Sequence, residues 1–131
     1  SIQVLNLMSE LKTIIEFEDP NEVKVVVDLQ GNALYFSREP IPSLKKGVNN
    51  VPMLKQVCVI PFRRDFLVKY DHLKPTPLEI IESVDMMRVL EHGYKVKMIM
   101  TDSNTYAVDT RVDLDKVVKV MKNDPLMKLY N

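Results

Sequence analysis

The sequence predicts an α/β fold in which a mixed sheet carries flanking helices. Two apolar runs, 23–28 and 32–38, flank a glycine-containing link of hairpin length, which is typical of paired strands. By contrast, apolar residues recur at helical spacing over 77–92 and from 110 onwards. Strand and helix patterns are mixed throughout, so the class is α/β or α+β. The 131 residues suffice for one domain.

The first elements are predicted to be a strand, a short helix and a hairpin. Residues 2–7 have the pattern of a strand, and 11–17 that of one or two helical turns. The runs 23–28 and 32–38 are expected to pair antiparallel. Side chains along the second run should alternate between faces. One face would carry Leu34, Phe36 and Arg38, and the other Ala33, Tyr35 and Ser37.

The middle of the chain is predicted to hold a loop, a strand and a helix. Residues 43–52 have the composition of an exposed loop. The run 56–62 is apolar enough for a strand buried on both faces, with Pro61 at its end, at a bulge or at an edge. Cys58 in this run is interpreted as a buried thiol of a reducing compartment. Apolar residues at helical spacing over 62–70 predict a helix.

The clearest helix is predicted to begin at Thr76 and to end at Gly93. Thr76 can cap it, Pro77 fits its first turn, and Glu79 can close a capping box. Apolar residues lie on two sides, so we expect a helix that is buried on both. The main stripe consists of Ile80, Ile81, Val84, Met87 and Leu90, whereas Leu78 and Val89 face nearly the opposite way.

The last elements are a strand and a helix. Residues 94–100 have the pattern of a strand with one face partly in water. A Thr-x-x-Asp start at Thr110 then leads into a helix that has apolar residues on one side.

Composition excludes several classes of partner. Lysine plus arginine equals aspartate plus glutamate at 18 each, so no general basic surface is available for nucleic acid. No apolar stretch approaches the roughly 20 residues that span a bilayer, so we expect no membrane contact and a cytoplasmic location. His72 and His92 lack partners at ligand spacing and are interpreted as structural or solvated. With three glycines and no glycine-rich phosphate loop, the chain carries no nucleotide cradle of its own.

Three charged residues are candidates for chemistry. Arg38, at the end of a strand, could clamp a carboxylate bidentately, or it could form an ion pair with Glu39 or another surface acid. Asp109, next to a helix start, could be an oxygen ligand for Mg²⁺ or a helix-start charge. Asp85 lies three residues before Arg88 and could simply pair with it.

Four segments in order resemble the C-terminal half of the CMP-Kdo synthetases, the 3-deoxy-manno-octulosonate cytidylyltransferases. These segments read NEVKVVVDLQGNALYFSREPIP, KQVCVIPFRRDFLVKY, PTPLEIIESVDMMRVLEHGYKV and AVDTRVDLDKV. The resemblance implies a nucleotidyltransferase (Rossmann-like) fold and a homodimer. It also implies transfer of CMP from CTP, with Mg²⁺, to a sugar acid for cell-envelope polysaccharide.

The resemblance assigns roles to the candidates. Arg38 matches the arginine of a Tyr-Phe-Ser-Arg motif that approaches the sugar acid. Asp109 matches the aspartate of a Val-Asp-Thr motif that helps to bind Mg²⁺ beside the triphosphate. Asp85 stands where the family usually has a glutamate that contacts the sugar.

Departures from the family pattern concern the sugar. Gln56 and Ile60 replace a histidine and a tyrosine, and Met86 replaces the glutamine that usually follows the sugar-binding glutamate. A site that loses hydrogen-bonding side chains distinguishes less sharply between sugars that differ in their hydroxyl groups. The sugar could therefore be Kdo, a related amino sugar or another 2-keto-3-deoxy acid. Gln56 is retained with Arg38 and Asp85 as a substrate-binding candidate.

The family's N-terminal, nucleotide-binding half is not represented in this sequence, which begins at Ser1 rather than at methionine. We therefore expect residues 1–131 to be the sugar-acid-binding and dimerisation part of a larger enzyme, inactive by itself. The alternative is a non-catalytic homodimerisation module derived from that family.

Overall fold

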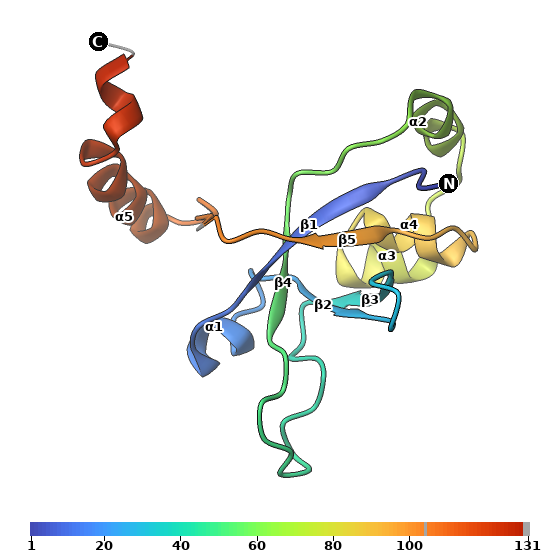
Figure 1. Cartoon of the computed structure of the whole chain (residues 1–131), viewed down its shortest axis with the longest axis horizontal. Coiled ribbons are helices and arrows are strands. Elements are labelled where there is room, and N and C mark those ends of the chain that lie inside the picture. Colours follow the sequence, from blue (N-terminus) through green and yellow to red (C-terminus); the bar gives the residue numbers. More distant parts are fainter. Residues whose placement is uncertain (104, 130–131) are drawn as a thin grey trace.

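The computed structural model describes residues 1–103 and 105–129, and it contains a five-stranded sheet in the order β3-β2-β4-β1-β5 (Figure 1). The strands are β1 (Leu5–Glu10), β2 (Lys24–Val27), β3 (Ala33–Ser37), β4 (Leu54–Val57) and β5 (Lys97–Met100). The helices are α1 (Ile14–Glu18), α2 (Arg64–Asp71), α3 (Pro77–Glu82), α4 (Met86–Glu91) and α5 (Arg111–Lys122), followed by the 3₁₀ helix η1 (Pro125–Leu129). Because β5 is parallel to β1 and the other neighbours are antiparallel, the sheet is mixed and the predicted fold class is confirmed.

The core lies between the sheet and the helices α2, α3 and α4. Its fully buried side chains include Phe36 and Val25 from the sheet and Phe66 from α2. Val89 and Met87 of α4 also belong to this cluster. Figure 1 shows α3 and α4 beside β3, whereas α5 stands away from the sheet at the end of an extended segment.

The predicted hairpin of β2 and β3 is present, but the expected alternation along β3 is wrong at Leu34. Val26 pairs with Tyr35 and Val27 pairs with Ala33, so the register skips one residue. Leu34 is the residue left over, and it is 60% exposed. A β-bulge shifts the faces in this way, because the extra residue has no partner across the ladder.

The single helix predicted from Thr76 to Gly93 is instead two helices, α3 and α4. They are separated at Ser83, which has left-handed backbone angles of φ 54° and ψ 51°. The change of direction takes Ile80 and Ile81 into solvent, where they are 70% and 74% exposed, and it buries Val89 completely. The expected continuous stripe is therefore wrong, while the predicted cap at Thr76 with Glu79 is confirmed.

The strand predicted over 56–62 is also shorter, since β4 ends at Val57. The amide of Val59 turns back to donate to the carbonyl of Val57 at 2.7 Å, which interrupts the ladder. Cys58 is exposed at this irregularity, so the interpretation as a buried thiol is wrong.

The remaining predicted elements are present within shifted bounds. The first strand, expected at 2–7, is β1, and the strand expected at 94–100 is β5. The cap at Thr110 is confirmed, because its hydroxyl accepts from the amide of Asp113 at the start of α5. Over the described ranges 1–103 and 105–129, no helix combines the length and apolarity needed to cross a membrane.

Candidate functional site

The end of β3 is joined to the end of α3 by a group of polar contacts, here called the Glu82 junction (Tyr35, Ser37, Arg38, Glu82 and Ser83). The Glu82 carboxylate accepts from the Tyr35 hydroxyl at 3.0 Å, the Ser37 hydroxyl at 3.0 Å and the Arg38 amide at 3.0 Å. Burial and the bond to Glu82 raise the pKa of Tyr35. The Tyr-Phe-Ser-Arg motif thus delivers three donors to one carboxylate.

The guanidinium group of Arg38 donates to backbone carbonyl oxygens. Nε donates to the carbonyl of Glu82 at 2.7 Å, Nη1 to that of Pro20 at 2.9 Å, and Nη2 to that of Ser83 at 3.0 Å. The ion pair with Glu39 that the sequence offered as one alternative is therefore wrong. A guanidinium has five N–H donors, so two remain for a ligand.

Lys24, which sequence reasoning did not select, lies buried beneath this junction. Its side chain is fully buried, and its ammonium group donates to the carbonyl of Asp19 at 2.8 Å and to that of Arg38. Burial lowers the pKa of Lys24, although the nearby Asp19 opposes that effect. A lysine inside an apolar strand is the signal that could have identified it.

Asp85 lies two residues beyond Ser83, at the start of α4, and is exposed. The sequence alternative that pairs it with Arg88 is wrong, because Arg88 binds Glu79 with N–O distances of 2.5 and 2.8 Å. Arg38 and Asp85 are thus brought to neighbouring parts of the molecule, since Arg38 binds the turn that leads to Asp85.

Gln56 lies in β4 and is half-buried. Its amide nitrogen donates to the side-chain oxygen of the fully buried Asn6 at 2.6 Å. Asn6 in turn donates to the carbonyl of Val57 at 2.7 Å. The amide nitrogen of Gln56 is therefore bonded within the sheet.

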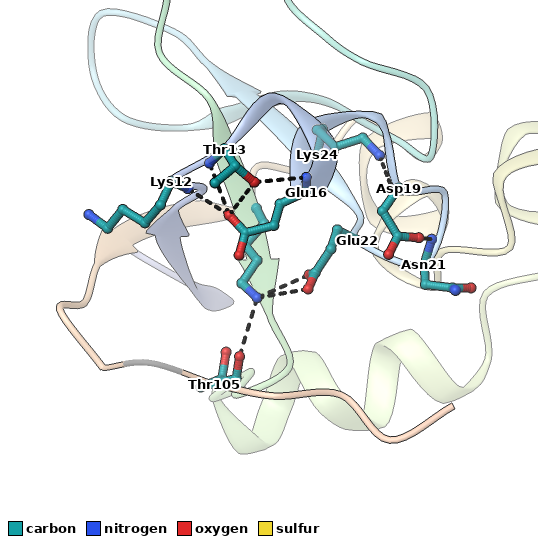
Figure 2. A network of polar contacts seen from close by, with 9 residues as sticks. Lys12, Thr13, Glu16, Asp19, Asn21, Glu22, Lys24 and Thr105 are labelled. Carbon is teal, nitrogen blue, oxygen red and sulfur yellow. Dashed lines mark hydrogen bonds and ion pairs between the residues drawn. The ribbon is translucent and has the colours of Figure 1, made fainter. Parts of the chain in front are cut away.

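Apart from the Glu82 junction, a hollow of about 390 Å³ lies over the part of the sheet near α1. At its wall the ammonium group of Lys55 binds Glu22 at 3.0 Å and the carbonyl of Thr105 at 3.3 Å. Figure 2 shows Glu22 and Thr105 approaching this same ammonium group. Lys55 thereby ties the extended segment before α5 to the sheet.

Glu16 in α1 also lines this hollow. Burial raises the pKa of its carboxyl, but hydrogen bonds from the amides of Lys12 and Thr13 outweigh that effect and hold the pKa below its usual value. Figure 2 shows both neighbours around the Glu16 carboxylate.

Asp109 follows the same extended segment and is exposed. Its carboxylate suits Mg²⁺, which takes one or two carboxylates and completes its shell with phosphate oxygens and water. No cluster of three or more histidine, cysteine, aspartate or glutamate side chains suited to a metal occurs in the part of the chain that the structure describes.

The fold and these sites define an α/β nucleotidyltransferase architecture. The sequence profile of the cytidylyltransferase family matches residues 3–99, and the chain belongs to that family. The resemblance found in the sequence is thereby confirmed.

Individual relatives are 3-deoxy-manno-octulosonate cytidylyltransferases. The Geobacter metallireducens protein is 40% identical over 129 residues, which cover 91% of this chain and 51% of that protein. The Synechococcus elongatus protein is 46% identical over 99 residues, which cover 76% of this chain and 41% of that protein. The chain thus spans about half the length of the curated relatives it matches.

A solved structure described as CMP:2-keto-3-deoxy-manno-octonic acid synthetase complexed with CTP is similar to this fold. The TM-score is 0.83 at 32% sequence identity, and the match covers 93% of this chain and 50% of that chain. The likeness therefore extends over nearly all of the sheet and the helices described above.

Proposed function

We propose that this chain supplies the sugar-acid side of a cytidylyltransferase, which joins CMP from CTP to a 3-deoxy-2-keto sugar acid for cell-envelope polysaccharide. The sugar acid would be 3-deoxy-manno-octulosonate (Kdo) or a relative. The observation that carries this proposal is the likeness to the CTP-complexed synthetase over 93% of the chain. Membership of the cytidylyltransferase family supports the same reaction class.

In this reaction the anomeric hydroxyl of the sugar attacks the α-phosphorus of CTP, and pyrophosphate leaves. Two N–H groups of Arg38 remain to hold the sugar carboxylate, while exposed Asp85 accepts from sugar hydroxyls and Gln56 contributes its remaining amide oxygen. Asp109 would hold Mg²⁺, which neutralises phosphate charge when bound. Because the chain places such groups without a nucleotide cradle, its contribution is binding and orientation.

The direct test measures pyrophosphate release from CTP and Kdo. We expect none from the 131-residue chain alone, because its three glycines form no phosphate-binding loop. We expect release from a chimera in which these residues replace the matching half of the Geobacter metallireducens relative. Circular dichroism and CTP binding would verify that the chimera is folded. A folded, CTP-binding chimera that is inactive with Kdo and with other 2-keto-3-deoxy acids would contradict the proposal.

We also propose a homodimer and a cytoplasmic location, where CTP is available. Exposed apolar side chains support association: Ile80, Ile81, Val59 and Leu29 are each at least half exposed. These side chains equally favour the second candidate function, a homodimerisation module without catalysis. The activity of the chimera distinguishes the two.

A further inference from the structure

Ser83 has an unusual backbone conformation for its residue type. Its φ of 54° and ψ of 51° place it in the left-handed region, where a side chain is normally disfavoured. A residue other than glycine keeps such angles only where surrounding contacts hold it. Asp85 follows two residues later, so the contacts that hold Ser83 also fix the path of the chain toward Asp85.

Those contacts come from the end of β3, mainly from Arg38, and they involve both the side chain and the backbone of Glu82. Its carboxylate receives the hydroxyls of Tyr35 and Ser37 and the amide of Arg38, all at 3.0 Å. Its carbonyl receives Nε of Arg38 at 2.7 Å, and the next carbonyl, that of Ser83, receives Nη2 at 3.0 Å. The peptide units on both sides of the left-handed residue are thus fixed to the end of β3.

The start of α4 follows from this turn. The amide of Val84 donates to the carbonyl of Glu79, and that of Met87 to the carbonyl of Val84. Val84 and Met87 are then buried in the core, which fixes the direction of α4. Asp85 lies between these two residues, and its exposed side chain stands at the point where the chain re-enters a helix.

We propose that Glu82 is a positioning residue for the sugar acid. One carboxylate orients Arg38, through its amide, and holds the turn that presents Asp85. The inference rests on the proposed function insofar as Arg38 and Asp85 contact the sugar. Replacing Glu82 should therefore weaken binding of the sugar acid and leave binding of CTP unchanged.

The first test uses the 131-residue chain and needs no activity. Hydrogen exchange of the amides of Val84 and Met87 is compared between the unmodified chain and Glu82→Ala. We expect exchange to be about tenfold faster in the variant, since the turn loses its anchor. Adding Ser83→Gly should restore much of the protection, because glycine adopts these angles without a steric cost.

The second test uses the chimera with Kdo and CTP as probes. We expect Glu82→Ala to raise the KM for Kdo by about tenfold or more, with little change in the KM for CTP. Arg38 and Asp85 would no longer be held in the positions that binding of the sugar requires. Glu82→Gln should retain most of the Kdo affinity. Its oxygen can still accept from the Arg38 amide, and its nitrogen can donate to the two hydroxyls. Glu39→Ala, an exposed acid beside Arg38, is the matched control.

The outcomes separate the two proposals. Faster exchange in Glu82→Ala that Ser83→Gly reverses, together with a raised Kdo KM, supports the positioning role. Unchanged exchange, or changed exchange with an unchanged Kdo KM, overturns it. If Glu82→Ala does not fold, Glu82→Gln takes its place: unchanged exchange with a Kdo KM raised about tenfold or more overturns the role, because binding is then lost although the turn is intact. If the unmodified chimera is inactive, the proposed function fails, and unchanged exchange would still overturn the role of Glu82 at the turn.

Discussion

The ammonium group of Lys24 and the guanidinium group of Arg38 both donate to carbonyl oxygens. Lys24 donates to the carbonyls of Asp19 and Arg38, and Arg38 donates to those of Pro20, Glu82 and Ser83. Carbonyl partners are fixed by the backbone, so they hold a side chain in one place without the mobility of a surface ion pair. These bonds therefore fix the positions of both cationic groups relative to the backbone.

Phe36 provides a test of the core at the scale of one residue. It is fully buried, so Phe36→Ala is expected to lower the free energy of unfolding by about 3–5 kcal/mol, through lost burial and a residual cavity. Urea titration of the chain measures this change. Leu34→Ala on the same strand is the control, because the bulged Leu34 is 60% exposed and its loss should cost about 0.5 kcal/mol or less. Equal losses would contradict the bulge.

Asp109 gives a prediction about the metal. In the chimera, Asp109→Asn is expected to lower kcat and to raise the Mg²⁺ concentration needed for half-maximal rate by about tenfold or more, since a neutral amide is a poorer ligand. Magnesium titration of the initial rate measures both effects. Asp102→Asn, exposed on the same extended segment, serves as the control. An unaltered magnesium dependence would return Asp109 to a helix-start role.

At the scale of elements, α3 and α4 are tied together by two carboxylates. Glu79 of α3 binds Arg88 of α4, and their side chains are only 10% and 20% exposed. Glu91 of α4 accepts from the amides of Leu78 and Glu79 at 3.0 and 3.2 Å, which caps the start of α3. Each helix therefore provides polar partners for the other. Neither helix is long enough to be stable alone.

This tie predicts a loss of stability in acid. The hydrogen bond from Arg88 lowers the pKa of Glu79 below its ordinary value of 4.5. Its contribution is therefore complete above pH 4.5 and is lost as the pH falls through the lower folded-state pKa. Glu79→Gln should cost about 1–3 kcal/mol at neutral pH and progressively less below that window.

Urea unfolding at several pH values checks the prediction for Glu79. Glu10→Gln is the matched control. The side chains of Glu10 and Lys12, which form an ion pair, are 61% and 70% exposed, and exposed ion pairs contribute little to stability. A penalty for Glu79→Gln that is the same at every pH would contradict the assigned role of the Arg88 pair.

The elements also show which features could be predicted from the sequence. The hairpin and the caps at Thr76 and Thr110 depend on neighbouring residues, and all three were correctly predicted. The break at Ser83 was not, because the contacts that hold it come from β3, more than 40 residues away in sequence. The exposure of Cys58 was missed for a different reason, since a tight turn from Val57 to Val59 interrupts an otherwise apolar run.

For the candidate site, the sequence identified candidate residues but not the side chains and carbonyl groups that surround them. Arg38 and Asp85 were selected from motifs; the structure places Arg38 in the Glu82 junction and Asp85 two residues beyond its last member, Ser83. Glu82 itself was missed, because a glutamate within an amphipathic helix resembles any solvated residue. Only the tertiary fold places its carboxylate opposite Tyr35 and Ser37.

At the scale of the whole molecule, the two faces of the sheet are covered unequally. The helices α2, α3 and α4 pack on one face, whereas α5 has no buried residue among those described. Figure 1 shows α5 and η1 set apart from the sheet. A chain with so much uncovered apolar surface is expected to associate.

Static light scattering at micromolar concentration tests this expectation. We predict a mass twice the 15.2 kDa of one chain, and a dilution series should show the equilibrium with the monomer. A single mass of one chain across that series would contradict the homodimer.

The turn between β2 and β3 reaches the far end of the sheet. Asn32 forms a bridge with Lys97, the amide of Ala33 donates to the carbonyl of Val96, and the amide of Met98 donates to the carbonyl of Gly31. The outer side of β5, which would otherwise offer free amides and carbonyls to strands of other molecules, is thus occupied over 96–98. Open strand edges are where β-rich proteins begin to form fibrous aggregates. This corner therefore protects one margin of the sheet against uncontrolled assembly, and it directs association toward side-chain surfaces.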